Sequence, residues 1–182
     1  MDAVNPQHYL QKAQLIHSEQ AVNQAIARIA GQLNLDYVAE APVVLCVMSG
    51  GVFFTGQLLP KLLFPLELNY VHASRYHGEL KGNKIKWIVK PTSAVKNRDV
   101  LILDDILDEG ITIKAIVDAC YLLGANEVKV AVLAEKRIDK SKPISADYVE
   151  LILPNRYVFG CGMDIHNWWR NLPAIYALHN PK

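Results

Sequence analysis

The sequence predicts an α/β fold with a mainly parallel sheet flanked by helices. Short apolar runs alternate with segments of helical periodicity, and the runs are apolar at successive positions, as in strands buried on both faces. Polar motifs with glycine follow several of these runs, at the place where such sheets bind ligands. With 182 residues, 51% hydrophobic and 20% charged, the chain is expected to form one domain with a substantial core.

The N-terminal half alternates helix and strand signals. Residues 1–17 contain Pro6 and mixed polar residues, and we expect a loosely attached arm or a short helix. Ser18 is a favoured N-cap, and apolar residues then recur at helical spacing, which predicts an amphipathic helix over 18–33. The later elements expected here are a buried strand over 43–48, a helix over 52–63, a strand over 66–74, a polar loop over 75–84 and a strand over 85–89.

The C-terminal half continues the alternation. An apolar strand is expected over 100–103 and a helix over 111–123, which Gly124 ends as the residue after the cap. Further strands are expected over 128–134 and 148–153, the second stopped by Pro154. The remaining residues are rich in aromatic side chains without a clear period, and an irregular segment is expected there.

Charge and cysteine content exclude several classes of function. The net charge is +1, from 19 basic and 18 acidic residues, so nucleic-acid and membrane-surface binding have no electrostatic support. The sequence has no secretory leader pattern and no apolar run that could span a bilayer, which predicts a cytoplasmic protein. Cys46 and Cys120 lie in apolar segments and, with Cys161, form no CxxC pair, so buried free thiols are expected.

The most informative segment is residues 100–113, Val-Leu-Ile-Leu-Asp-Asp-Ile-Leu-Asp-Glu-Gly-Ile-Thr-Ile. An apolar strand ends in two adjacent carboxylates, turns through Asp108-Glu109-Gly110 and enters a helix. The backbone N–H groups of a helix start can hold a phosphate, and paired carboxylates can hold ribose hydroxyls or a metal. The segment therefore predicts a site for a phosphorylated sugar.

This segment resembles the phosphoribosyl pyrophosphate (PRPP) signature of the type I phosphoribosyltransferases. More closely, residues 18–178 resemble the bacterial hypoxanthine(-guanine) phosphoribosyltransferases, through Ser49-Gly50-Gly51, Lys136-Arg137 and the stretch from Arg156 to Arg170. The resemblance implies one phosphoribosyltransferase domain over 1–182, with a core of about 36–150 and a small hood from about 1–35 and 151–182. It implies purine salvage, in which PRPP and hypoxanthine or guanine give IMP or GMP and pyrophosphate.

The resemblance also implies a role for each motif. Asp108 would exchange a proton with purine N7, and Lys136 would donate to O6. Tyr157 would stack on the purine, and the Val158 backbone would contact its edge. The PRPP contacts implied are Asp104, Asp105, Asp108, Glu109, Gly110, Ile111 and Thr112. The pyrophosphate loop implied is Ser49, Gly50 and Gly51, with Arg170, and often has a cis peptide at the position of Met48-Ser49. Mg²⁺ is the implied cofactor, with Asp104, Asp105 and Asp164 as ligands, and homo-oligomers (dimer or tetramer) are usual.

The sequence departs from the resembled pattern at four places, one of which is Ile111, where Lys or Leu is common. Asp104-Asp105 stands where many relatives have Glu-Asp, and Glu109 stands where Thr is common. The pair implied for a mobile lid is Arg75-Tyr76 here, where relatives often have Ser-Tyr. The roles of Glu109 and Arg75 are therefore left open.

Two alternatives to a hypoxanthine or guanine enzyme are kept. One is a PRPP-binding regulatory protein of the same fold, which the absence of an added DNA-binding motif and of basic excess disfavours. The other is a xanthine-preferring enzyme, because nothing in the sequence separates hypoxanthine, guanine and xanthine. Adenine is disfavoured, since a Lys donor at Lys136 would face its amino group.

Overall fold

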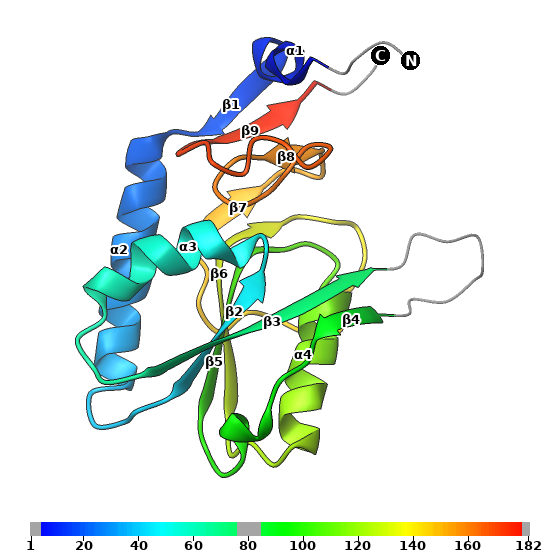
Figure 1. The fold of residues 1–182 in the computed structure, drawn as a ribbon. Coiled ribbons are helices and arrows are strands. Elements are labelled where there is room, and N and C mark those ends of the chain that lie inside the picture. The colour runs from blue at the N-terminus through cyan, green and yellow to red at the C-terminus, as the bar shows by residue number, and fades with distance from the viewer. Residues whose placement is uncertain (1–4, 76–84, 180–182) are drawn as a thin grey trace.

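A computed structural model describes residues 5–75 and 85–179. The chain forms a six-stranded sheet and, beside one end of it, a three-stranded sheet (Figure 1). The elements, in chain order, are α1 (Pro6–Gln11), β1 (Ala13–His17), α2 (Glu19–Asp36), β2 (Val43–Met48), α3 (Gly51–Leu58), β3 (Glu67–Arg75), β4 (Ile85–Val89), β5 (Val100–Leu107), α4 (Ile111–Leu122), β6 (Val128–Lys136), β7 (Leu151–Leu153), β8 (Val158–Phe159) and β9 (Ile175–Leu178).

The larger sheet has the strand order β4-β3-β2-β5-β6-β7. Its strands run parallel except for the edge strand β4, which pairs antiparallel with β3. The chain leaves β2 toward β3 on one side and later returns to β5 on the other side, so β2 and β5 flank a topological switch point. Ligands of open α/β sheets bind beyond the carboxyl ends of strands at such a point, and the predicted motifs after β2 and β5 meet there.

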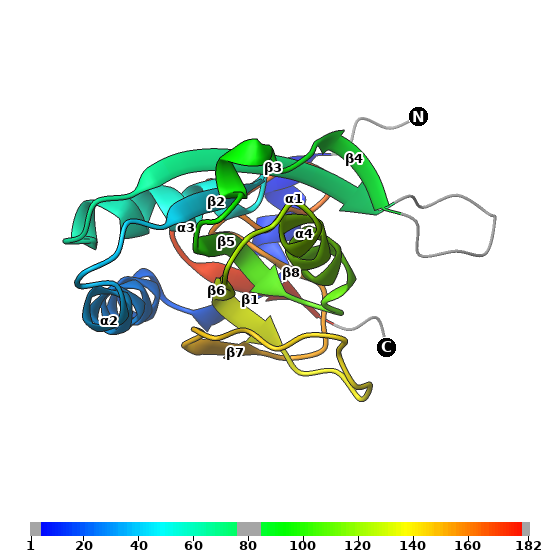
Figure 2. The same cartoon turned by 90° about the horizontal axis from the view of Figure 1, so that it is seen from below.

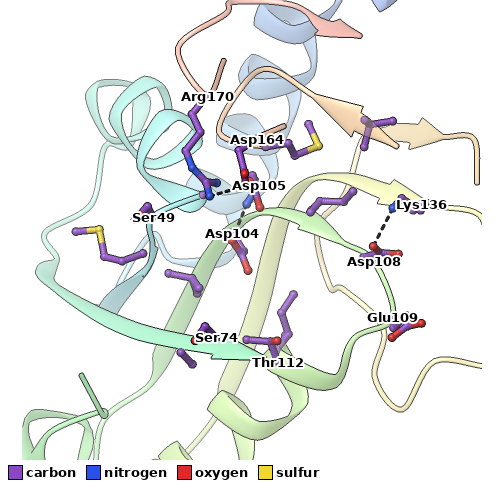
Figure 3. Close-up of a pocket in the computed structure, with 18 of the residues that line it drawn as sticks. Ser49, Ser74, Asp104, Asp105, Asp108, Glu109, Thr112, Lys136, Asp164 and Arg170 are labelled. Carbon is purple, nitrogen blue, oxygen red and sulfur yellow. Dashed lines mark hydrogen bonds and ion pairs between the residues drawn. The ribbon is translucent and has the colours of Figure 1, made fainter. Parts of the chain in front are cut away.

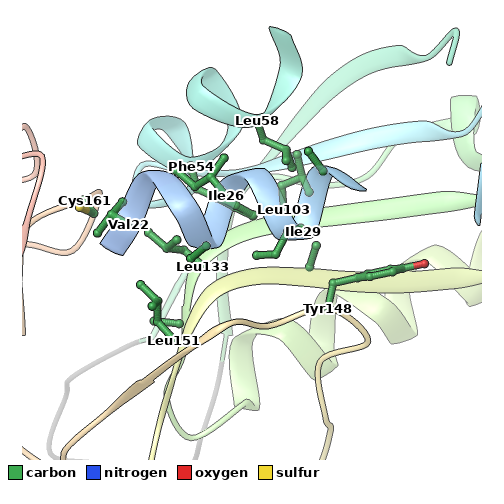
Figure 4. Close-up of a cluster of buried hydrophobic side chains, with 14 of the residues drawn as sticks. Val22, Ile26, Ile29, Phe54, Leu58, Leu103, Leu133, Tyr148, Leu151 and Cys161 are labelled. Atoms are coloured by element: carbon green, nitrogen blue, oxygen red, sulfur yellow. The ribbon is translucent and has the colours of Figure 1, made fainter. Parts of the chain in front are cut away.

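Helices cover both faces of this sheet (Figures 1 and 2). On one face α2 and α3 pack against β5 and β6, in a cluster that includes Ile26, Phe54, Leu103 and Leu133 (Figure 4). On the other face α4 packs through Ile113, Ile116, Val117 and Cys120 against alternate residues of β2, β3, β5 and β6. Because strands buried on both faces carry no polar alternation, these runs are continuously apolar. The predicted α/β class is confirmed.

The smaller sheet joins the two ends of the chain, with the strand order β1-β9-β8. Residues 13–17, expected within an arm or short helix, form β1 and pair antiparallel with β9, and only 6–11 are helical. The C-terminal segment, expected to be irregular, contributes β8 and β9. The short helix expected near the N-terminus is confirmed at Pro6–Gln11, whereas the strands β1, β8 and β9 were not predicted. β1 and β9 pair across more than 150 residues, and local periodicity does not reveal such partners.

Several element bounds also differ from expectation. The strand expected over 100–103 continues through the two carboxylates to Leu107, and the helix expected over 52–63 ends at Leu58 and continues as a 3₁₀ turn over Leu59–Lys61. The predicted glycine after the α4 cap is confirmed, since Gly124 has φ +88°. The segments expected for the hood, 1–35 and 151–182, include α2 and β7, which pack with the six-stranded sheet.

The cysteines are all free and buried, as predicted. Among residues 5–75 and 85–179, none of the helices has both the length and the apolar character needed to cross a membrane.

Candidate active site

A cavity of about 670 Å³ opens at the carboxyl ends of β2, β3, β5 and β6 (Figure 3). It is bordered by the hood, which in the structure consists of the three-stranded sheet β1-β9-β8 and residues 160–174 between β8 and β9. It brings together most of the residues that the sequence singled out: Ser49, Gly50, Asp104, Asp105, Asp108, Glu109, Gly110, Thr112, Lys136, Tyr157, Val158, Asp164 and Arg170. These residues come from five separate stretches of the chain, and the parallel sheet and the hood place them around one space.

Asp104 and Asp105 end the apolar part of β5 and are only 8% and 6% exposed. The Asp105 N–H donates to Asp104 Oδ1 at 2.9 Å. Burial raises the pKa of both carboxyl groups, and the neighbouring Asp105 charge raises that of Asp104 further, while Arg170 acts against the rise. Two adjacent buried carboxylates are costly to ionise unless cations or hydrogen-bond donors lie close to them, so this position favours binding of such groups.

The loop after β2 approaches this acid pair closely. The peptide between Met48 and Ser49 is cis, as the resemblance implied. A Cβ on Gly50 would lie 2.3 Å from Asp105 Oδ2, so only glycine permits this approach. Helix α3 begins directly afterward at Gly51, and its first N–H groups face the same end of the sheet.

The turn after β5 leads into α4. Gly110 is the N-cap with φ +78°, a conformation that glycine adopts without strain. The first turn of this 12-residue helix holds Thr112, which lines the cavity. Unpaired N–H groups and the dipole at a helix start favour an anion, and Thr112 adds a hydroxyl donor.

On the other side of the turn, Asp108 faces Lys136 at the end of β6 (Figure 3). Lys136 Nζ lies 2.8 Å from Asp108 Oδ2, with the Lys136 side chain 14% exposed and that of Asp108 42% exposed. The pair places a cationic donor and an anionic acceptor side by side on one wall of the cavity.

The hood closes the cavity with residues from the segment after β8. Arg170 pairs with Asp164 at 2.5 Å and donates to the Gly162 carbonyl at 2.6 Å. Asp164 also accepts from the Asn167 N–H at 2.8 Å. Burial, and next the Asp164 carboxylate, raise the pKa of Tyr157, so its phenol stays protonated and its half-exposed ring forms part of the wall.

The chain is similar to known proteins in both sequence and fold. Residues 13–166 match the family described as "Phosphoribosyl transferase domain". The chain belongs to the phosphoribosyltransferase family. It is 32% identical over 165 residues to a hypoxanthine-guanine-xanthine phosphoribosyltransferase of Tritrichomonas foetus, with 90% of each chain covered. It is 30% identical over 165 residues to a hypoxanthine-guanine phosphoribosyltransferase of Streptococcus mutans, covering 90% of this chain and 92% of the relative.

Solved structures agree with this family assignment. A hypoxanthine phosphoribosyltransferase of Staphylococcus aureus superposes with a TM-score of 0.87 at 26% identity, with 97% of each chain covered. A solved hypoxanthine-guanine-xanthine phosphoribosyltransferase superposes with a TM-score of 0.81 at 31% identity, covering 93% of this chain and 99% of the other. The phosphoribosyltransferase fold predicted from the sequence is therefore confirmed.

Among the residues that the structure describes, the predicted site residues Gly51 and Ile111 of this phosphoribosyltransferase do not line the cavity. They are the first residues of α3 and α4. Arg75 ends β3, and Tyr76 falls outside the described residues, as does most of the loop expected over 75–84. Sequence reasoning missed Ser74 and Asn167, polar residues that also line the cavity; neither belongs to a motif that would have revealed it.

The carboxylates fit a magnesium ion in part. The described residues contain no cluster of three or more His, Cys, Asp or Glu side chains suited to a metal. Mg²⁺, however, is usually held by one or two carboxylates together with substrate oxygens and water. The buried pair Asp104 and Asp105, with Asp164 lining the same cavity, supplies hard oxygen donors of that kind.

Proposed function

We propose that this phosphoribosyltransferase acts in purine salvage, transferring the 5-phosphoribosyl group of PRPP to hypoxanthine or guanine. The products are IMP or GMP and pyrophosphate. The relatives and solved neighbours described above are all named for hypoxanthine, guanine or xanthine, which are 6-oxopurines. The observation in this chain that supports the proposal most strongly is the pairing of Lys136 with Asp108.

This pair matches one edge of a 6-oxopurine. The O6 and N7 atoms lie side by side on that edge, where O6 accepts hydrogen bonds. Lys136 offers a donor to O6, and Asp108, 2.8 Å away, offers an acceptor to an N7–H group. Adenine would present an amino donor to the Lys136 ammonium, which has only donors, so one buried group would be left unpaired.

PRPP fits the rest of the cavity. The turn over 108–112 would hold its 5′-phosphate through backbone N–H groups and the Thr112 hydroxyl. The loop Ser49-Gly50-Gly51 and the Arg170 guanidinium would hold the pyrophosphate, since guanidinium groups bind phosphate oxygens in pairs. Asp104 and Asp105 would accept from the ribose hydroxyls between these two phosphate sites.

The reaction follows from these positions. Purine N9 attacks C1 of the ribose, the bond from C1 to the pyrophosphate oxygen breaks, and the N7 proton passes to Asp108. As positive charge develops at the ribose, the buried carboxylates stabilise it electrostatically, while Arg170 stabilises the departing pyrophosphate. In the reverse direction Asp108 returns the proton as a general acid.

We propose Mg²⁺ as the cofactor, held by Asp104, Asp105 and Asp164 together with substrate oxygens. When bound, Mg²⁺ neutralises charge on the leaving pyrophosphate. Asp164 is paired with Arg170. This ion pair holds a carboxylate for the metal and a guanidinium for the pyrophosphate on the same side of the cavity.

We also propose a cytoplasmic homo-oligomer, a dimer or tetramer. The free, buried cysteines suit a reducing compartment. Leu68 and Tyr70, each 51% exposed, and Ile88, 56% exposed, point to one face of β3 and β4 beyond the cover of α3. Exposed apolar side chains gathered on a sheet face are typical of a protein contact, and light scattering after gel filtration would measure the assembly.

A steady-state assay of hypoxanthine, guanine, xanthine and adenine, each with PRPP and Mg²⁺, tests the proposed function. We expect turnover with hypoxanthine or guanine and none with adenine. Turnover with adenine alone would refute the assigned role of Lys136. PRPP binding without turnover of any base, together with a mobility shift of nucleic acid, would favour a regulatory protein instead.

A further inference from the structure

Lys142 lies outside every motif considered so far, yet it contacts the backbone beside both base-recognition residues. Its Nζ donates to the Leu107 carbonyl at 2.9 Å and to the Lys136 carbonyl at 2.7 Å. It also donates to Glu135 Oε1 at 2.9 Å. Leu107 directly precedes Asp108, and Leu107 and Glu135 are the last paired residues of β5 and β6. Lys142 therefore joins the two strand ends just where their ladder stops.

The two residues after Lys142 pack against the turn between β5 and α4. A Cβ placed on Gly110 would lie 3.2 Å from the Ile144 side chain and 3.4 Å from the Pro143 ring. Pro143 and Ile144 thus pack against the start of α4 while Lys142 holds its other side. Polar and apolar contacts independently make the segment 142–144 a brace under the turn that carries Asp108.

We propose that Lys142 is a positioning residue that fixes the Asp108 carboxylate and the Lys136 ammonium at the spacing a 6-oxopurine edge requires. This inference rests on the proposed function and adds to it a residue that never touches the substrate. Lys142 acts through the two carbonyls, because moving either strand end changes the separation between Asp108 and Lys136.

The chemistry of the site requires lysine. An ammonium group has three divergent N–H donors, and here three acceptors from different directions receive them. The Lys142 side chain is only 11% exposed, and Glu135 supplies its counter-charge. Arginine presents its donors in a flat fork, so it preserves the charge without reaching all three acceptors.

The test compares Lys142→Met, Lys142→Arg and the matched control Lys140→Met, an exposed lysine of the same loop. For Lys142→Met we expect kcat/KM for hypoxanthine to fall on the order of 100-fold, as displacement of a reacting group by about 1 Å can cause. PRPP affinity, measured by calorimetry, should fall less than kcat/KM, because the turn over 108–112 would hold only the 5′-phosphate, while the proposed ribose and pyrophosphate contacts lie outside it. Lys142→Arg should show a partial loss, and Lys140→Met should match wild type.

A double-mutant cycle with Lys136→Ala separates positioning from general structural support. If Lys142 acts through Lys136, the Lys142→Met change should cost far less in the Lys136→Ala background than alone. Additive losses would overturn the proposal, as would wild-type kinetics in Lys142→Met. Full recovery in Lys142→Arg would also overturn it, by showing that charge alone suffices.

Hydrogen exchange without substrate separates this proposal from the proposed function. The brace predicts faster amide exchange over 108–112 in Lys142→Met than in wild type and Lys140→Met. If wild type turned over no purine, the proposed function would fail, and the exchange rates would still decide whether the brace exists. Equal exchange rates in all three proteins would overturn it.

Discussion

The contact between hood and core can be tested at one glycine. Gly162 lies in the hood turn after β8 with φ +104°, and a Cβ there would lie 2.1 Å from the Gly50 carbonyl oxygen and 3.0 Å from Asp105 Cβ. Gly50 belongs to the proposed pyrophosphate loop and Asp105 to the acid pair. Gly162→Ala therefore forces the hood away from two parts of the PRPP site at once.

The cost of Gly162→Ala has two components. Overpacking a close contact costs about 1–3 kcal/mol, and holding a residue other than glycine in a sparsely populated backbone region costs about 1–3 kcal/mol. The expected loss in the free energy of unfolding is thus about 2–6 kcal/mol. For a chain of this length each kcal/mol shifts Tm by about 2–4 °C, which gives a fall of roughly 4–24 °C.

Thermal denaturation followed by circular dichroism measures this effect, and Gly31→Ala is the matched control. Gly31 lies inside α2, and a Cβ there meets nothing within 4 Å. Alanine in a helix interior is more stable than glycine by about 0.5–1 kcal/mol, so the control should raise Tm slightly. If Gly162→Ala melted at or above the wild-type Tm with normal turnover, the close hood contact inferred here would be wrong.

Three further predictions concern the charged residues. Asp108→Asn should lower kcat about 10²–10⁴-fold in steady-state assays, the range for a lost general base, while calorimetry shows PRPP binding retained. Lys136→Ala should raise the KM for hypoxanthine far more than that for PRPP, and equal rises would indicate a structural lysine. Asp104→Asn should abolish most turnover yet raise Tm. Because burial raises the folded-state pKa of Asp104, its contribution to stability falls as pH rises above about 4, so the gain in Tm should be larger at pH 8 than at pH 5.

The sequence predicted the core of the fold well because its signals are local. Residues 43–48 and 100–103 are apolar without alternation, and that pattern is physically tied to strands covered on both faces. The hood strands carry no such signal. In β1, residues 13–17 are all partly buried or exposed. Their partner strand β9 lies more than 150 residues away in the sequence, so no local pattern predicts the pairing.

The residues of the candidate site also fall into those that local sequence patterns predict and those that they do not. Asp104, Asp108 and Thr112 are close in sequence, and the end of a strand followed by a helix start fixes how they face the cavity. Lys136 could be placed at the same edge, because parallel strands end together. The positions of Lys142 and Asn167 could not be predicted from the sequence. Each lies in an irregular segment whose path local patterns do not specify: Lys142 in the loop from β6 to β7, and Asn167 in the hood turn after β8.

The acid pair explains why the hood must pack so tightly on the core. Asp104 and Asp105 are buried with raised pKa values, so the ligand-free protein pays an electrostatic cost near neutral pH. Arg170, held by Asp164 and the Gly162 carbonyl, is the cation that offsets part of this cost. The Gly50–Gly162 contact sets how closely Arg170 approaches the pair. A looser hood would leave the carboxylates more hydrated and Arg170 farther from the phosphate site, so close packing at one glycine serves both stability and electrostatic preorganisation.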